Sequence, residues 1–144
     1  MAKRLTISLK PKYAMQVNRV SIGNKKLVYL IVVKKPLRYP WGRSSRIAYI
    51  GTTKKGVARI AQSVAARAGT VLTLYGVREF IVRIVTCPPR PNVKTWDKLE
   101  TSLLITFRAM YGSLPKCNTK PKRAGDVFDY FKRERLERVL EMLE

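Results

Sequence analysis

The chain has 144 residues, 46% of them hydrophobic, which is enough for one compact domain with a buried core and excludes a disordered chain. Lys and Arg number 30 against 9 Asp and Glu, so the formal net charge is +21. Histidine is absent, which excludes a Ser-His-Asp triad, a Cys-His pair and an HExxH zinc site, and the two cysteines make no disulfide framework or zinc cluster.

No segment of the sequence has the character of a membrane anchor. The longest apolar run, residues 27–33, is far shorter than the ~20 residues that a membrane-spanning helix needs. The first twelve residues are basic but hold no apolar stretch of the length found in signal peptides. We therefore expect a cytoplasmic protein with no membrane partner.

The first third of the chain predicts strands. Residues 5–9 alternate apolar and polar side chains, which indicates a short edge strand. Residues 27–33 are β-branched and aromatic, which is typical of a buried strand. Two prolines and a glycine in residues 34–45 predict a long basic hairpin loop, and residues 46–50 are the returning strand.

The middle of the chain predicts two helices around a third strand. Apolar residues recur at helical spacing over residues 57–68, and Gly69 suits the C-terminal cap. Residues 79–86 resemble a strand, and residues 94–111 have the apolar stripe of a second helix.

A last amphipathic helix is expected over residues 126–144, with Asp126 as its N-cap. Its apolar side should pack on the domain or on a second subunit, which makes it a candidate homodimer contact. The fold class is therefore α+β: a small three-stranded, mainly antiparallel sheet flanked by helices, with an extra C-terminal helix.

The charge is concentrated in residues 1–125, which hold 26 basic residues and only three acids: Glu79, Asp97 and Glu100. A body of this charge repels itself unless a polyanion screens it. Nucleic acid is the favoured partner, because neutralising phosphates releases condensed counterions. An anionic membrane surface is the rival, but the basic residues lie between strands rather than along one amphipathic helix.

Five residues are candidates for chemistry, and each also has an ordinary structural interpretation. Glu100, with apolar neighbours on its helix, could hold Mg²⁺ or could pair with a nearby lysine or arginine. Tyr29 and Tyr49 lie in strands, where tyrosine usually belongs to the core, and Arg59 would ordinarily be a surface charge. Asn118 lies in a basic loop.

Taken in chain order, these residues resemble the GIY-YIG nuclease superfamily. Tyr49 begins an unchanged Tyr-Ile-Gly motif, Arg59 follows ten residues later on a helix, and Glu100 precedes a Leu-Leu-Ile sequence. Asn118 lies in a "P…N" segment like the one that ends the family's core. The resemblance covers about residues 27–119, and it implies a nuclease domain over residues 1–125.

The resemblance also implies a role for each residue. Tyr29, its pKa lowered by a cation and an arginine, would act as general base on the attacking water, and Tyr49 would orient that water or Tyr29. Arg59 would bind the phosphate. Glu100 would hold one divalent cation, Mg²⁺ or Mn²⁺, and Asn118 would hold the site by hydrogen bonds across the fold.

The sequence departs from the family at two places. Residues 27–29 read Leu-Val-Tyr in place of Gly-Ile-Tyr, so the tyrosine is kept without the glycine. Ser63 stands four residues after Arg59, where the family often has His or Tyr on the phosphate.

The remaining basic residues are expected to bind the substrate, with Tyr39 and Trp41 available to stack on bases. They are Lys34, Lys35, Arg38, Arg43, Arg46, Lys54, Lys55, Lys116, Lys120, Lys122 and Arg123.

Three functions remain open at this point. The first is a GIY-YIG-type endonuclease acting on duplex or branched DNA. The second is a non-catalytic nucleic-acid-binding module, either a decayed nuclease or a ribosomal-type RNA binder. The third is a membrane-surface or assembly protein that uses the C-terminal helix.

Overall fold

The computed structural model describes residues 4–12, 25–122 and 130–144. Its elements, in chain order, are β1 (Leu27–Arg38), β2 (Ser44–Thr53), α1 (Val57–Leu72), β3 (Phe80–Val85), α2 (Thr95–Tyr111) and α3 (Arg133–Glu141). The strands form one antiparallel sheet in the order β2-β1-β3, which confirms the expected α+β class. The last helix is shorter than the expected 126–144, because residues 130–132 are not helical and α3 begins at Arg133. The N-cap expected at Asp126 lies outside the described residues.

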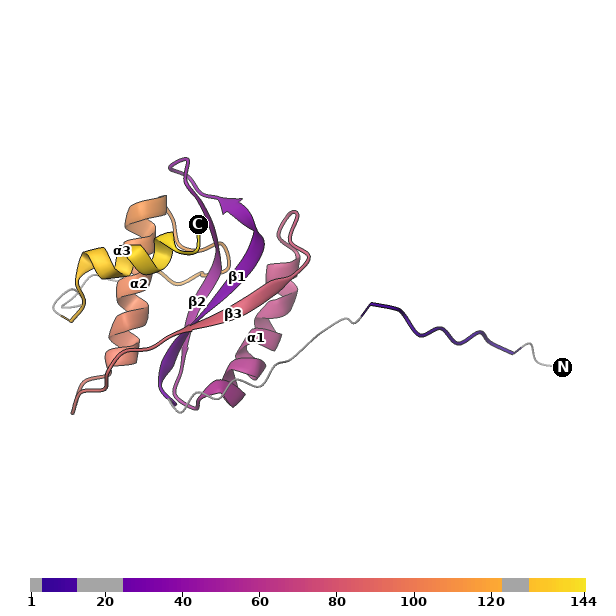
Figure 1. Ribbon diagram of the computed structural model, residues 1–144, viewed down its shortest axis with the longest axis horizontal. Helices are drawn as coiled ribbons and strands as arrows, with labels where there is room; N and C mark the ends of the chain where they lie inside the picture. Colours follow the sequence, from indigo (N-terminus) through magenta and orange to yellow (C-terminus); the bar gives the residue numbers. More distant parts are fainter. Residues whose placement is uncertain (1–3, 13–24, 123–129) are drawn as a thin grey trace.

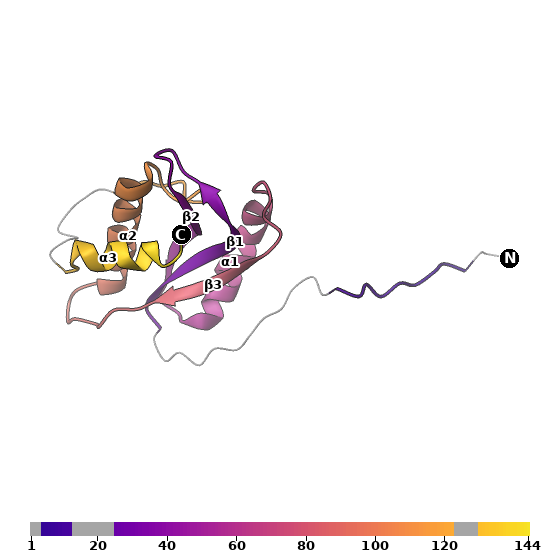
Figure 2. The same ribbon diagram turned by 45° about the horizontal axis from the view of Figure 1, so that its top comes forward.

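Strand β1 is the central strand of the sheet and contributes much of the hydrophobic core. Its first seven residues, 27–33, are all buried, because β1 has a neighbour on each edge and helices on each face. Figures 1 and 2 show α1 on one side of the sheet and α2 with α3 on the other. An uninterrupted β-branched and aromatic run fits a strand covered on both faces.

The β1–β2 hairpin is tighter than the loop expected over residues 34–45. Both strands continue into this segment, and only residues 39–43 remain as the turn. Leu37 is buried, so its side chain holds the end of β1 in the sheet. The register shifts between Val32 and Leu37, and the bulge accommodates Pro36, which has no backbone N–H for the ladder.

Helix α1 runs past Gly69, its expected cap, and ends at Leu72. Gly69 lies on the exposed side of the helix, while Val71 is fully buried and continues the apolar stripe. The Thr73 hydroxyl donates to the Thr70 carbonyl oxygen at 2.6 Å and helps to close the last turn.

Helix α3 packs on α2 and β2, with Leu136 and Leu140 buried. The residues after it lie along the start of β2, where the Arg46 amide donates to the Leu143 carbonyl oxygen at 2.8 Å. The Glu144 carboxylate accepts a hydrogen bond from the Tyr111 hydroxyl at 2.9 Å and pairs with an arginine of the hairpin turn. The last residues are thereby attached to the hairpin.

The edge strand expected over residues 5–9 is wrong. Residues 4–10 are described without secondary structure, and Leu5, Ile7 and Leu9 are between 93% and 96% exposed. Figure 1 shows this segment extending away from the sheet, and it pairs with none of the described strands.

Candidate active site

Two tyrosines face each other across the β1–β2 pair. The ring centroids of Tyr29 and Tyr49 are 5.9 Å apart, and the ring planes meet at 40°. Gly51 pairs with Tyr29 in the sheet, and a Cβ built on it would lie 2.7 Å from the Tyr29 hydroxyl and 2.7 Å from the Tyr49 ring. The glycine of Tyr-Ile-Gly is therefore the residue that leaves room for both rings.

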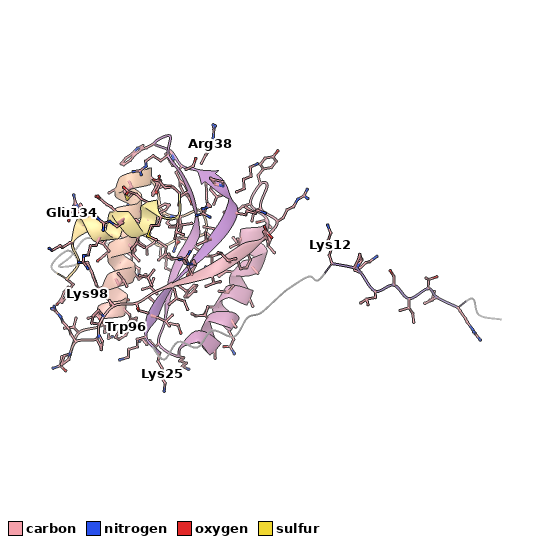
Figure 3. All side chains as sticks on the ribbon, viewed as in Figure 1. Lys12, Lys25, Arg38, Trp96, Lys98 and Glu134 are labelled. Carbon is pink, nitrogen blue, oxygen red and sulfur yellow. The ribbon has the colours of Figure 1, made fainter. Side chains whose placement is uncertain are left out.

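The two larger helices begin at the end of the sheet that carries this pair. The Gly56 amide, just before α1, donates to the Lys25 carbonyl oxygen at 2.8 Å. The Lys26 ammonium lies 4.5 Å from the centre of the Trp96 ring in the first turn of α2. Figure 3 shows Lys25 and Trp96 together at this end and Arg38 at the opposite one. Both helices thus begin near this end of the sheet, α1 on one face and α2 on the other (Figures 1 and 2).

Burial governs the acidity of Tyr29. Desolvation, with the neighbouring Tyr49, raises the pKa of Tyr29 to about 12. A hydrogen bond from Ser63 and the positive charge of Arg67 favour the phenolate, but they do not offset burial. The lowered pKa expected for Tyr29 depends on a bound cation, and it stays a prediction for the metal-bound protein.

Ser63 and Arg67 are the residues of α1 that contact the tyrosine pair. The Arg67 guanidinium carbon lies 4.2 Å from the centre of the Tyr49 ring, a cation–π geometry. Sequence reasoning assigned no role to Arg67 and treated Ser63 only as a missing partner. The available signal was their spacing, because residues four apart share one face of a helix.

Arg59 lies in the first turn of α1 and is exposed. Its guanidinium donates to the Gln62 side-chain oxygen rather than to either tyrosine. Arg59 therefore lies near the end of the sheet that carries the tyrosine pair, but its side chain bonds to Gln62 and not to Tyr29 or Tyr49.

Asn118 holds the strand that carries the second motif. Its amide nitrogen donates to the Ile50 carbonyl oxygen, and its side-chain oxygen accepts from the Ile50 amide, both at 2.9 Å. The Cys117 amide donates to the Ala48 carbonyl oxygen, also at 2.9 Å. Cys117 and Asn118 thus bind backbone groups on the outer edge of β2, and Asn118 does so at Ile50, between Tyr49 and Gly51.

Glu100 is the buried acid of the described chain. It lies on α2 with its side chain 10% exposed, and the Lys122 ammonium is 3.4 Å from its carboxylate. Lys122 follows Asn118 in the same loop, so this ion pair links α2 to the segment that holds β2. Mg²⁺ is commonly bound by one or two carboxylates completed by water and substrate phosphate oxygens, and a single carboxylate fits that class. The described residues contain no group of three or more acids or cysteines that would form a fuller metal site.

The basic residues expected to bind nucleic acid fall into three sets. Some have partners within the chain: Lys34 pairs with Glu79, Lys122 with Glu100, Arg43 with the Glu144 side chain and Arg46 with the Glu144 carbonyl. Lys35 lies over the Tyr75 ring and Lys116 over the Tyr39 ring. Exposed on the surface are Arg38, Lys54, Lys55 and Lys120, and Arg123 lies outside the described residues.

Comparison with protein families, curated proteins and solved structures finds no match to this chain. Within the ranges that the structure describes, none of the helices combines the length and apolar character needed to cross a membrane. The geometry and charge of the site therefore carry the functional argument.

We predict that Gly51→Ala damages the site and the fold together. The new methyl group would overlap both tyrosine rings, so we expect the free energy of unfolding to fall by about 1–3 kcal/mol. Chemical denaturation followed by circular dichroism measures this change.

Gly69→Ala is the matched control for that substitution. A Cβ at Gly69 meets no atom within 4 Å, and the residue is helical, so the same change should stabilise the protein by about 0.5–1 kcal/mol. Equal effects at both glycines would contradict the close packing described for Gly51.

The raised pKa of Tyr29 predicts a loss of stability in alkali. Because the folded pKa lies above the ordinary value of 10, the folded state holds this proton more tightly. The resulting contribution of Tyr29 to the free energy of unfolding is complete below pH 10 and is lost as the pH rises toward 12. Denaturation at a series of pH values should show a smaller alkaline fall for Tyr29→Phe than for the wild type. Parallel curves for the two proteins would refute the assignment.

Proposed function

We propose that this chain is a metal-dependent endonuclease that hydrolyses DNA phosphodiester bonds, as its resemblance to the GIY-YIG nucleases implies. The observation that carries the proposal is the tyrosine pair over Gly51. Tyr29 and Tyr49 come from the two strands that hold the resembling motifs, and their spacing depends on the glycine of the second motif. An ordinary core tyrosine pair requires neither this glycine nor an arginine over one ring.

Charge around the pair supports a phosphate ligand. Arg59 is exposed in the first turn of α1, and Lys54 and Lys55 are exposed in the turn that precedes this helix. A phosphodiester placed beside Tyr29 would meet these cations, and an arginine donates a fixed pair of hydrogen bonds to phosphate oxygens. The high net charge of the chain adds long-range attraction for DNA.

The proposed chemistry assigns proton transfer to Tyr29. Its phenolate oxygen would accept the proton of the attacking water, and Ser63 and Arg67 both favour that phenolate. Tyr49 would orient Tyr29 or the water from the opposite side of the pair. When bound, Mg²⁺ supplies positive charge for the phosphate and the leaving oxygen, and Glu100 would hold it. Asn118 fixes the backbone of β2 on which Tyr49 and its glycine are carried.

A second candidate function is non-catalytic binding of nucleic acid. The observation that favours it is the ion pair between Glu100 and Lys122, which already neutralises the only buried acid of the described residues. The raised pKa of Tyr29 points the same way, because a protonated tyrosine is not a base. The two functions differ in one property: a binding module needs neither Glu100 nor a divalent cation.

We predict that supercoiled plasmid is nicked in the presence of Mg²⁺ or Mn²⁺ and that EDTA abolishes the reaction. Glu100→Gln and Tyr29→Phe should each lower the rate roughly 10²–10⁴-fold, because one removes the metal ligand and the other the general base. Agarose gels follow the conversion of supercoiled to open-circular DNA.

Glu79→Gln is the matched control, since it makes the same change in charge at an exposed acid paired with Lys34. It should leave the nicking rate unchanged. Binding of labelled DNA, measured by anisotropy in EDTA, should weaken with salt in every variant. Salt-dependent binding by the wild type without nicking, on duplex and branched DNA alike, would reject the nuclease and support the binding module.

A further inference from the structure

Strand β3 leaves one edge of the sheet without a partner. The order β2-β1-β3 places β3 at an edge, and the described residues pair it only with β1. At the other edge, the loop through Cys117 and Asn118 bonds to β2. An open edge exposes backbone N–H and C=O groups that can accept a further strand.

Strand β3 also carries incompletely buried apolar side chains on both of its faces. Ile81 is 58% exposed and shares one face with Arg83, whereas Val82 and Ile84 are half-buried on the other face. Helix α2 packs on β1 and β2, so its side of the sheet is not covered at β3. Natural edge strands are usually protected by charge, proline or a covering segment, and here Arg83 is the one charged residue within the strand.

The segment 4–10 has the complementary properties. It contains Leu5, Ile7 and Leu9 at alternate positions, so in an extended conformation all three project from one side. Each is more than nine-tenths exposed, an unusual state for three large apolar side chains within five residues. Figures 1 and 3 show the segment and Lys12 beside it well away from the sheet.

We propose that residues 4–10 of one copy of this chain add as an extra strand to the free edge of β3 in a second copy. Strand β3 has six residues, so the segment is long enough to pair along its whole length. The added strand would satisfy the open backbone groups and cover Leu5, Ile7 and Leu9 beside the apolar side chains of β3. Because both copies carry a segment and an edge, the exchange closes as a symmetric dimer.

The second copy is the occupant that the geometry favours. In the structure the segment does not fold back onto its own β3, although that edge is free. The contact also needs no other protein, because one chain supplies both surfaces. Charge opposes it, since each chain carries +21, and this gives the dimer a distinctive signature. Salt should strengthen the dimer by screening, whereas it weakens DNA binding.

The test uses the full chain without metal or nucleic acid, so its outcome is independent of the proposed nuclease activity. Light scattering after size exclusion should give a dimer whose dissociation constant falls as NaCl rises from about 0.1 to 0.5 M. Substituting Leu5, Ile7 and Leu9 together by Ser should weaken the dimer at least tenfold. The matched control changes Thr6 and Ser8 to Ala on the opposite side of the same segment and should leave the dimer intact.

Hydrogen exchange by mass spectrometry locates the contact. In the wild type, amides of residues 4–10 and 80–85 should gain protection together as the protein concentration rises, and the triple Ser variant should lose both effects. A monomer at every concentration and salt would overturn the proposal. So would a dimer that survives the triple substitution, or one that forms without protection of residues 80–85.

Discussion

The candidate site depends on one backbone register, the pairing of Tyr29 in β1 with Gly51 in β2. That pairing places the second tyrosine beside the first and requires that the residue opposite carry no side chain. A slip of one residue would turn every side chain of β2 to the other face of the sheet. Asn118 fixes the same strand from outside by bonding to both backbone groups of Ile50, so the register is held on both edges of β2.

A second constraint is the imbalance of charge. The body is rich in cations, and several are held by contacts within the chain, as Glu79 holds Lys34 and Glu100 holds Lys122. The remaining cations near the start of α1 face solvent. The ion pair at Glu100 stabilises the fold, but it competes with the proposed function. The same carboxylate would have to give up part of its contact with Lys122 in order to bind a metal ion.

Much of the fold could be predicted from the sequence, because residues 27–33 form an uninterrupted β-branched and aromatic run and the helices of residues 57–72 and 95–111 have apolar periodicity. The hairpin could not be delimited, since the burial of Leu37 overrides the local effect of Pro36. The segment 5–9 has the pattern of a strand, but pattern alone does not supply a partner.

The candidate site was predictable only in part. Tyrosine spacing and the Tyr-Ile-Gly motif indicated the pair, and the structure gives Asn118 a direct bond to that motif. The contacts of Ser63 and Arg67 depend on how α1 packs on the sheet. The direction of the Tyr29 pKa depends on burial, which sequence spacing does not reveal.

The most direct test of the central claim is to ask where a divalent cation binds. Mn²⁺ added to the full chain with a short duplex should selectively broaden the NMR signals of the Tyr29 and Tyr49 rings and of the Asn118 side-chain amide. The effect should disappear in Glu100→Gln and persist in Glu79→Gln. Broadening that is spread over the surface, or that is unchanged in Glu100→Gln, would contradict a metal site beside the tyrosine pair.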